Sequence, residues 1–394
     1  MDYVFSNRTN GMKPSAIREI VKYFEGTKCI QFADGNPSAE SFPIDAIHKI
    51  SEHIISDHAA EVFQYGVSEG YKPLRETIKK RMEKCNCVRD FDEIVITSGS
   101  QQAIDLSSRT FLNEGDTVIC DNPSYMGALN NFQSYNINLV GIEMEKDGMN
   151  IAMLEKSLKE EKNVKLIYVV PTFQNPTGIS ISLEKRKAIY ELAKKYGVII
   201  IEDNPYGDLR YKGQDIPPIK SLDTEGIVIY CGSFSKVLCA GIRIGYALAP
   251  ASIIDKIVIG KQVDDVHTGS FFQVLAEHYM NQYDFDAHID SIRELYRHKL
   301  SIMTSCLNEK MKECVYQEPE GGLFLWCDLP KWVNSMAYCK QAGENGVAVV
   351  PGLTFTIDEN PNCNAIRLNF STPSDEQIEK GITILADTLN SFKK

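Results

Sequence analysis

Short apolar runs alternate with helix-length amphipathic segments through the middle of the chain, and this alternation restricts the fold more than any other feature. The segments between the runs have helical periodicity, most clearly at Gln101–Leu112, Ile151–Lys162 and Leu183–Tyr196. The order predicts an α/β fold with a mainly parallel sheet that has helices on both faces. The runs are rich in β-branched side chains and are the predicted strands: Glu93–Thr97, Thr117–Cys120, Leu139–Ile142, Lys165–Val170, Gly197–Glu202 and Ile227–Cys231.

The pattern changes beyond about residue 285, where we expect a smaller α+β domain that the N-terminal segment joins in space. The 394 residues also exceed what one compact core usually holds. We therefore divide the chain into an N-terminal arm (1–44), a large domain (45–285) and a small C-terminal domain (286–394). The predicted elements of the small domain are a long helix, Phe285–Lys312, the strand Leu323–Asp328, a helix near Lys331–Ala342, the strands Val347–Val350 and Ala365–Phe370, and a final helix.

The charge balance and the cysteines limit the partners and the compartment. The net charge is −11 and no tract is rich in lysine or arginine, so neither nucleic acid nor an anionic membrane is an expected partner. The polar N-terminus lacks the apolar stretch of a signal peptide, and the longest apolar runs are too short to span a bilayer. The eleven cysteines are scattered, and several lie in apolar stretches, which predicts a reducing cytoplasm.

The loop after the first predicted strand, Ser98–Gln102, has the composition of an anion site. Small residues at a helix N-terminus leave free backbone N–H groups, and the positive end of the helix dipole lies behind them. Together these groups would bind a phosphate. An ordinary glycine turn with a serine cap explains the same residues and stays open as the alternative.

Asp203 follows the fifth predicted strand. An unpaired carboxylate at the end of a buried strand is costly, so Asp203 needs a partner, and a protonated pyridine nitrogen would supply one. A helix-capping aspartate is the alternative.

The loop after the sixth predicted strand contains a lysine among small residues. Desolvation and a nearby cation would lower the pKa of Lys236 and free its amine for imine chemistry. Ser233, Ser235 and Arg243 would bind a dianionic phosphate. A solvated surface group is the alternative for Lys236 taken by itself.

Ser233 and Lys236 also fit the Ser-x-x-Lys pattern of the serine penicillin-binding enzymes. Residues 134–136 (Ser-Tyr-Asn) and 267–269 (His-Thr-Gly) mimic the other two motifs of that family. The first of these motifs precedes Ser233, whereas the family places it after the nucleophile. We therefore regard this match as accidental.

Four motifs are spaced along the chain: Pro171–Gly178, Asp203-x-x-Tyr206, Ser233-x-Ser235-Lys236 with Arg243, and Arg367 within Ile366–Ser371. Together they resemble the fold-type-I pyridoxal-phosphate (PLP) aminotransferases of class I/II, and the resemblance covers nearly the whole chain. The N-terminal segments 13–20 and 31–37 look like the aminoadipate/kynurenine/aromatic branch of that group, except that Asp34 replaces a small residue. The resemblance implies PLP as the cofactor and a seven-stranded sheet in the large domain.

The resemblance implies a role for each matching residue around the cofactor. Lys236 would hold PLP as a Schiff base and move a proton between the substrate Cα and the cofactor C4′. Asp203 would keep the pyridine nitrogen protonated, so that the ring accepts electrons. Asn175 and Tyr206 would bind the phenolic oxygen, and Tyr125 would stack on the ring. The phosphate would be held by Ser100, Gln101, Ser233, Ser235 and Arg243.

The resemblance also assigns residues to the substrate and to a second subunit. Arg367 matches the arginine that grips the α-carboxylate at two points, assisted by Asn175 and the N–H of Gly35. Arg18 is the candidate for recognising the substrate side chain, and a solvated or ion-paired helix arginine is the alternative. Tyr65 matches the tyrosine that reaches the neighbouring subunit's phosphate, which implies a homodimer with shared active sites.

The implied reaction moves an amino group between a larger amino acid (aromatic, aliphatic or aminoadipate-like) and a 2-oxo acid such as 2-oxoglutarate. A carbon–sulfur β-lyase is an alternative, because the cofactor does the chemistry and the pocket selects the bond that breaks. A similar body occurs as the effector domain of bacterial winged-helix regulators. Because the pattern starts by residue 13 and the net charge is −11, we do not expect a DNA-binding domain here.

We expect no metal site. His48, His53 and His58 are each five residues apart, so on one helix they do not share a face as an i, i+4 pair would. Cys85 and Cys87 have no second pair at zinc spacing. The histidines are therefore expected to be partly exposed helix residues.

Overall fold

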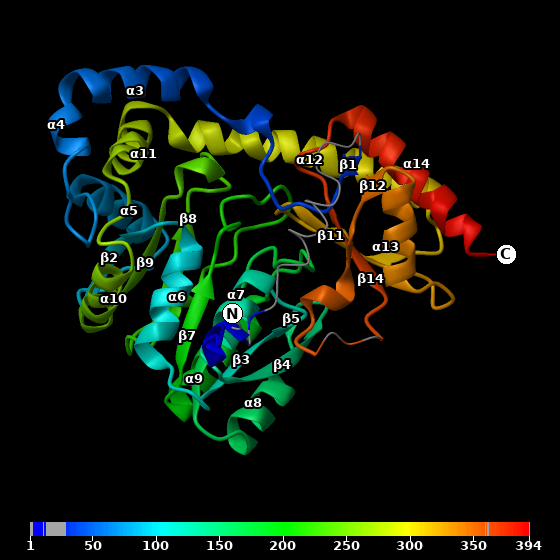
Figure 1. The fold of residues 1–394 in the computed structure, drawn as a ribbon, viewed down its shortest axis with the longest axis horizontal. Coiled ribbons are helices and arrows are strands. Elements are labelled where there is room, and N and C mark those ends of the chain that lie inside the picture. The colour runs from blue at the N-terminus through cyan, green and yellow to red at the C-terminus, as the bar shows by residue number, and fades with distance from the viewer. Residues whose placement is uncertain (1–2, 11, 13–28, 359, 361, 394) are drawn as a thin grey trace.

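The computed structural model describes residues 3–10, 12, 29–358, 360 and 362–393. Its centre is a sheet with the strand order β2-β9-β8-β7-β6-β3-β4-β5, flanked by helices (Figure 1). β5 has two residues and extends β4 as a hairpin, so seven strands form the body of the sheet. The strands are β2 (Asp92–Thr97), β3 (Thr117–Asn122), β4 (Asn138–Glu145), β5 (Gly148–Met149), β6 (Val164–Val169), β7 (Ile199–Asp203), β8 (Val228–Ser233) and β9 (Gly245–Pro250).

The sheet is mainly parallel, as predicted. β4, β3, β6, β7 and β8 run parallel in that order, whereas β9 is antiparallel to both β8 and β2. The sequence-based expectations did not include β9. β7 begins at Ile199 rather than Gly197, because Gly197 has φ +67° and ends the preceding helix in the left-handed conformation.

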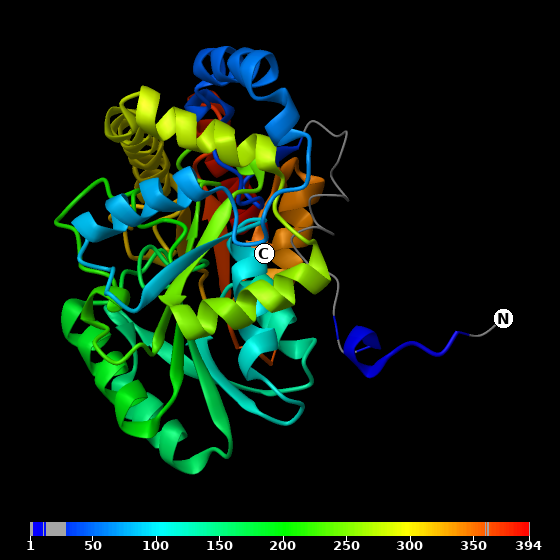
Figure 2. The ribbon, with the colours of Figure 1, turned by 90° about the vertical axis from the view of Figure 1, so that its left-hand side faces the viewer.

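The two faces of the sheet bury alternate residues of the same strands. In β6, Ile167 and Val169 pack with α8 and α9, whereas Leu166 and Tyr168 pack on the other side with α6 and α7. Figure 2 shows helices on both sides of the sheet. None of the described helices is both long and apolar enough to cross a membrane. The helices that flank the sheet are α5 (Lys72–Lys84), α6 (Ser100–Phe111), α7 (Met126–Gln133), α8 (Ile151–Glu160), α9 (Leu183–Tyr196), α10 (Ala251–Asp264) and α11 (Ser270–Gln282).

A second, smaller sheet lies beside α12 (Phe285–Lys310), α13 (Ser335–Glu344) and α14 (Asp375–Ser391). Its strand order is β10-β11-β14-β13, and its pairings are antiparallel. The predicted strand Val347–Val350 is divided, since its first half pairs elsewhere. α13 begins later than expected, because the Asn334 side chain caps it by accepting from the Ala337 N–H. The strands are β10 (Val315–Tyr316), β11 (Phe324–Asp328), β13 (Val350–Pro351) and β14 (Ala365–Asn369).

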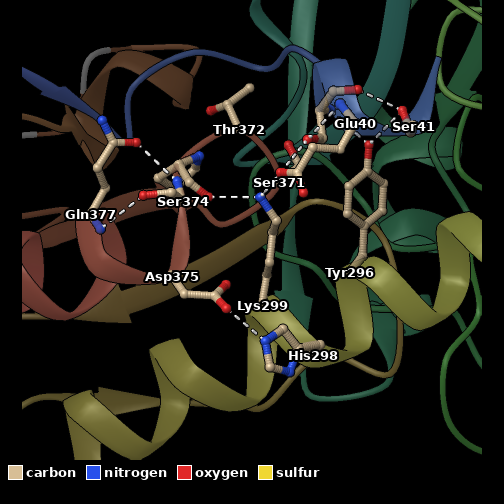
Figure 3. A network of polar contacts seen from close by, with 12 residues as sticks. Glu40, Ser41, Tyr296, His298, Lys299, Ser371, Thr372, Ser374, Asp375 and Gln377 are labelled. Carbon is tan, nitrogen blue, oxygen red and sulfur yellow. Dashed lines mark hydrogen bonds and ion pairs between the residues drawn. The ribbon is translucent and has the colours of Figure 1, made fainter.

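The N-terminal segment packs against this second sheet. β1 (Ile30–Gln31) pairs in parallel with β12 (Val347–Ala348). Figure 3 shows a polar network that joins the 3-10 turn at Ala39–Ser41, the helix α12 and the start of α14. Lys299 of α12 is 2% exposed and donates to Glu40 Oε1 and to the carbonyl of Pro373, each at 2.8 Å. The division of the chain at residues 44 and 285 stays a prediction.

Candidate active site

A cavity of about 600 Å³ lies beyond the carboxyl ends of the parallel strands. Twelve of the fourteen predicted site residues line it, although they are distributed from residue 35 to residue 367 of the chain. Asn36, Phe324 and Asn130 line it as well. The twelve residues are Gly35, Ser100, Gln101, Tyr125, Asn175, Asp203, Tyr206, Ser233, Ser235, Lys236, Arg243 and Arg367.

One end of the cavity is formed by the N-terminus of α6. The residue before the helix is Gly99, with φ +83°, and a Cβ at this position would collide with the guanidinium of Arg243. No side chain among the described residues caps the helix. The Ser98 hydroxyl donates to Asp265 at 2.9 Å instead, so the alternative of a serine cap does not apply. The first amides of α6 and the positive end of its dipole therefore point to the cavity.

Arg243 connects this helix start to the loop after β8. Its guanidinium donates to Ser235 Oγ at 3.4 Å and to the carbonyl of Ser98 at 3.3 Å. The Ser233 hydroxyl accepts from the N–H of Ser235 at 3.1 Å. A guanidinium, hydroxyl groups and a helix N-terminus in one place form an anion pocket of the size and polarity that a phosphate needs.

A buried ion pair fixes the loop that carries the anion pocket. Lys261 of α10 has a fully buried side chain and contacts Asp265 at 2.8 Å. Lys261 also donates to Gln102 Oε1 at 2.9 Å, and the same oxygen accepts from the N–H of Ser98 at 2.8 Å. Burial lowers the pKa of Lys261. These contacts hold residue 98 in place from outside the cavity.

Asp203 at the end of β7 is 2% exposed, and its two carboxylate oxygens have different surroundings. The Tyr168 hydroxyl donates to Oδ2 at 2.8 Å, whereas Oδ1 has no partner among the described residues. Burial raises the pKa of Asp203 to about 7, and the Tyr168 hydrogen bond opposes that shift. Asp203 caps no helix, because turns follow it in the chain. An open, buried carboxylate oxygen fits a cationic N–H donor such as a pyridinium.

Lys236 enters the cavity from the loop after β8. Its Nζ donates to the carbonyl of Gly35 at 2.6 Å. Burial lowers the pKa of Lys236 to about 8; Asp34 opposes the shift, and Arg243 and Arg367 add to it. The alternative of a solvated surface lysine is therefore wrong. An amine with a lowered pKa is the form that attacks a carbonyl.

Arg367 of β14 is 1% exposed and closes the opposite end of the cavity. It donates to Asn175 Oδ1 at 2.9 Å, to the carbonyl of Asp34 at 3.0 Å and to the carbonyl of Ala33. Its Nε has no partner among the described residues, and its guanidinium lies over the ring of Phe324 at 4.2 Å. Burial lowers the pKa of Arg367 to about 10. A buried guanidinium that has only neutral acceptors can bind a carboxylate.

Two tyrosines form the walls between these groups. Tyr206 is buried, and its ring lies edge-on to that of Phe324 at 5.9 Å. Burial raises the pKa of Tyr206, so it carries a hydroxyl that can donate. Tyr125 precedes α7 and lines the cavity with Gln101, whose amide donates to the carbonyl of Gly127 at 3.0 Å.

Two of the predicted site residues are not among those that line the cavity. Tyr65 is 81% exposed, and its ring contacts that of His267 at 5.9 Å. Arg18 lies outside the described residues, so its prediction stays as it was.

His53 and His58 are partly exposed, as expected, but the inference from their spacing that they do not come together is wrong. His53 and His58 do come together, with ring centroids 5.5 Å apart, and His278 joins them. The spacing argument assumed one continuous helix, whereas helix α3 (Ile44–Asp57) ends just before His58.

Sequence reasoning missed Tyr168 and Phe324, which hold Asp203 and Arg367 from behind. The signal for Tyr168 was available, since it is a polar-tipped residue within the apolar run Leu166–Val170 and needs a hydrogen-bond partner when buried. Phe324 gave no such signal, because an apolar residue in a strand is ordinary.

A mainly parallel sheet that ends in an anion pocket, an open carboxylate oxygen and a half-buried lysine defines the architecture of the fold-type-I PLP enzymes. Comparison with known proteins shows which family within this class the chain matches. The family model "Aminotransferase class I and II" matches residues 27–385. Aromatic-amino-acid aminotransferase 1 of Thermococcus litoralis is 41% identical over 402 aligned residues, which cover 100% of this chain and 96% of that protein.

Two solved structures have the same fold over almost their whole length. One is kynurenine aminotransferase of Pyrococcus horikoshii in complex with PMP, with 40% identity, a TM-score of 0.95 and coverage of 99% of this chain and 98% of that one. The other is α-aminoadipate aminotransferase of Thermus thermophilus with N-(5'-phosphopyridoxyl)-L-leucine, with 33% identity, a TM-score of 0.92 and the same coverage. The protein belongs to the class I and II aminotransferase family and is an enzyme of the transferase class.

Proposed function

We propose that this PLP-dependent enzyme moves an amino group between a larger amino acid and a 2-oxo acid such as 2-oxoglutarate. The side chain of the amino acid would be aromatic, aliphatic or aminoadipate-like. The relatives cited above are named after aromatic amino acids, kynurenine and α-aminoadipate. One observation carries the proposal: Lys236, Asp203 and Arg367 line the same cavity. Their side chains supply an amine, an acceptor for a ring N–H and a carboxylate clamp.

The residues of the anion pocket and Asp203 would hold the cofactor. The helix start at Ser100 and Gln101, with Arg243 and its two serines, offers a phosphate its donors. Asp203 Oδ1 would accept the pyridinium N–H, and Tyr206 with Asn175 would bind the phenolic oxygen. When bound, PLP supplies an electron sink that stabilises negative charge at the substrate Cα.

Lys236 would act twice. Its amine would anchor the cofactor, and when free, Nζ would carry a proton between the substrate Cα and the cofactor C4′. A pKa near 8 suits both steps, because the amine is then readily deprotonated near neutral pH. The carbonyl of Gly35 gives the free amine a place to donate, at 2.6 Å.

Arg367 would bind the substrate α-carboxylate. Its donors are held by the carbonyls of Ala33 and Asp34 and by Asn175, and a carboxylate would replace neutral acceptors by a charged one. Arg18 would recognise the substrate side chain. The Asp34 carboxylate accepts from Thr372 at 3.2 Å and from Asn36 at 3.1 Å.

A panel of amino acids, each mixed with the PLP form of the enzyme, tests the reaction. We expect aromatic, aliphatic or aminoadipate-like members to convert the absorbance of the cofactor to that of the pyridoxamine form, and 2-oxoglutarate to restore it. No conversion with any amino acid would contradict the proposal. Pyruvate released from cystine or cystathionine would indicate a β-lyase instead.

We also propose a homodimer with shared active sites, in which Tyr65 reaches the phosphate of the partner subunit. Tyr65 is 81% exposed and belongs to a stretch of exposed apolar side chains that includes Phe63 (72%) and Val67 (59%). The nearby Val266 (48%) and Phe272 (40%) extend it. A monomer rarely exposes so many large apolar residues in one place.

Mixing two inactive variants tests the shared site. In a heterodimer of Lys236→Met and Tyr65→Ala subunits, one of the two sites has both residues intact. We expect about a quarter of the sites to become active when the subunits reassort at random. If the mixture is no more active than its components, Tyr65 does not serve the partner's site.

We propose the cytoplasm as the compartment. The eleven cysteines are free thiols, among them Cys85, which is exposed. Thiols persist where glutathione and thioredoxin keep them reduced.

A further inference from the structure

Three histidine rings meet outside the cavity, where α3 (Ile44–Asp57), α4 (Ala59–Val62) and α11 pack together at one end of the molecule (Figure 1). They belong to His53, His58 and His278, and one ligand nitrogen of each lies within 4.8 Å of the others. The ring centroids are 5.5 to 5.7 Å apart. None of the three rings lines the cavity.

A break between two helices brings the first two rings together. On one continuous helix, residues five apart point about 140° away from each other. Here α3 ends at Asp57 and α4 begins at Ala59, and His58 between them has φ −122° and ψ 9°. The chain thereby turns His58 back towards His53 and towards α11.

A carboxylate lies at the Nδ1 atom of each ring. A carboxylate in this position favours the tautomer that has its proton on Nδ1, and Nε2 then keeps a lone pair for a ligand. The pairs are His53 with Asp57 at 2.8 Å, His58 with Glu61 at 3.2 Å and His278 with Glu277 at 2.8 Å.

The buried member of the group is itself held in place. His278 and Glu277 have side chains that are 10% and 16% exposed. The Asn281 amide donates to Glu277 Oε1 at 2.6 Å and to the Thr77 hydroxyl at 3.0 Å, which leaves Oε2 for the imidazole. The contact therefore extends from His278 through two further polar side chains into α5.

Ion pairing alone does not explain why the three rings converge. The side chains of Asp57 and Glu61 are 59% and 53% exposed, and exposed pairs of this kind contribute little to stability. Each pair would form equally well with its ring turned away from the others, and protonated rings this close would repel one another. A cation bound by three neutral imidazoles gives the convergence a cause.

We propose that His53, His58 and His278 bind one Zn²⁺ ion. Imidazole nitrogen is a preferred ligand of Zn²⁺, and three histidines with a water molecule complete its tetrahedral geometry. Zn–N bonds of about 2.0–2.1 Å require ligand atoms about 3.4 Å apart. The ligand nitrogens lie within 4.8 Å of one another, so the rings of His53 and His58, whose side chains are 44% and 32% exposed, would have to rotate to reach that spacing. The ion would link α3 and α4 to α11.

Zinc binding by the tag-free PLP-loaded enzyme tests the site. After treatment with a chelator and equilibrium dialysis against Zn²⁺, we expect one ion per chain and a higher thermal midpoint. His53→Gln removes a half-exposed ligand without disturbing the core, so it should lose the ion and the shift in midpoint. His278→Gln should behave in the same way, and Glu277→Gln should weaken binding about 10–100-fold by freeing the ring.

Two variants serve as matched controls. His48→Gln changes another histidine of α3, whose side chain is 70% exposed and pairs with Glu52. Cys85→Ser removes an exposed thiol that could bind zinc by itself. Both should keep the ion at full stoichiometry. If His53→Gln binds as much zinc as His48→Gln does, or if Cys85→Ser abolishes binding, the proposal is wrong.

Discussion

Strand β8 (Val228–Ser233) has a lysine near each of its ends, one fully buried and one half-buried, and the two are held in opposite ways. Near its start, Lys220 contacts both Asp92 and Asp223 at 2.9 Å, and all three side chains are fully buried. Beyond its end, Lys236 donates to a backbone carbonyl and has two arginines among its neighbours. Lys220 is therefore paired with two carboxylates, whereas the pKa of Lys236 is lowered.

The polar groups around the two lysines differ in whether their hydrogen-bonding atoms have partners. Asp92 and Asp223 use all of their oxygens, since Asp92 also accepts from the N–H of Arg89 and Asp223 from three amides in residues 226–228. In the cavity, Asp203 Oδ1 and Arg367 Nε have no partner among the described residues. A satisfied buried cluster fixes the fold, whereas a buried cluster with open positions is prepared for a ligand.

Replacing both lysines by methionine, one at a time, tests the comparison most directly. Lys236→Met should lower kcat/KM for transamination by at least about 10⁴-fold, since it removes the proton carrier. Its thermal midpoint should stay unchanged or rise, because no carboxylate loses its partner. A large loss of stability would show that Lys236, too, is a structural cation.

Lys220→Met should do the reverse. It leaves two buried carboxylates without a cation, so the free energy of unfolding should fall by about 3–5 kcal/mol in denaturant titrations. The kcat/KM of the folded enzyme should be nearly unchanged. Adding Asp92→Asn and Asp223→Asn to Lys220→Met should restore part of the stability. If it does not, the loss in Lys220→Met comes from the changed side-chain volume rather than from the unpaired charges.

Asp203→Asn and Asp223→Asn compare a carboxylate that has an oxygen without a partner with one whose oxygens all accept hydrogen bonds. An amide cannot keep the ring nitrogen protonated, so kcat should fall about 10²–10³-fold, as for the loss of one electrostatic contact in an active site. Asp223→Asn is the matched control, and we expect it to lower the unfolding midpoint and leave kcat unchanged. Equal kcat values for the two variants would contradict the assignment of Asp203.

The pH dependence of the free energy of unfolding gives a second test of the lowered pKa of Lys236. In the cofactor-free enzyme the pKa of Lys236 is lowered from 10.5 to about 8, so between these values the unfolded chain binds a proton that the folded chain does not. The free energy of unfolding of the wild-type enzyme, relative to that of Lys236→Met, should therefore rise as the pH goes from about 8 to 10.5. The same gain is lost when the pH falls back through that window to 8. Guanidinium titrations below, within and above that window measure it, and a constant difference would contradict the shift.

The smallest expected effect concerns Tyr168→Phe. It removes the one hydroxyl that donates to Asp203, which is worth about 1 kcal/mol. We expect cofactor affinity to weaken about fivefold, measured by fluorescence titration of the apoenzyme. A loss as large as that of Asp203→Asn would mean that Tyr168 itself takes part in the reaction.

Much of the fold and of the cavity could be predicted because the informative residues are local. Ser182 and Gly197 mark both ends of α9, the first by accepting from the Lys185 N–H and the second by its positive φ. The apolar runs of the parallel strands are continuous because both faces are buried. The motif residues follow strands directly, so the sheet edge brings them together.

The remaining features depend on contacts that leave no local trace. β9 was missed because Gly245–Pro250 contains small residues rather than a β-branched run, and it is a strand through its neighbours β2 and β8. The break at His58 has no proline or glycine to signal it. Val347–Val350 reads as one strand, yet its halves join different sheets.

The pairing of Ile30 with Val347 places the start of the chain beside a part that the ribosome makes much later. Arg367, which contacts Ala33 and Asp34, is made later still. The anion pocket, from Ser98 to Arg243, can therefore form on a nascent chain well before the clamp for the substrate carboxylate exists. The order of synthesis thus assembles the cofactor end of the pocket first and the substrate end last.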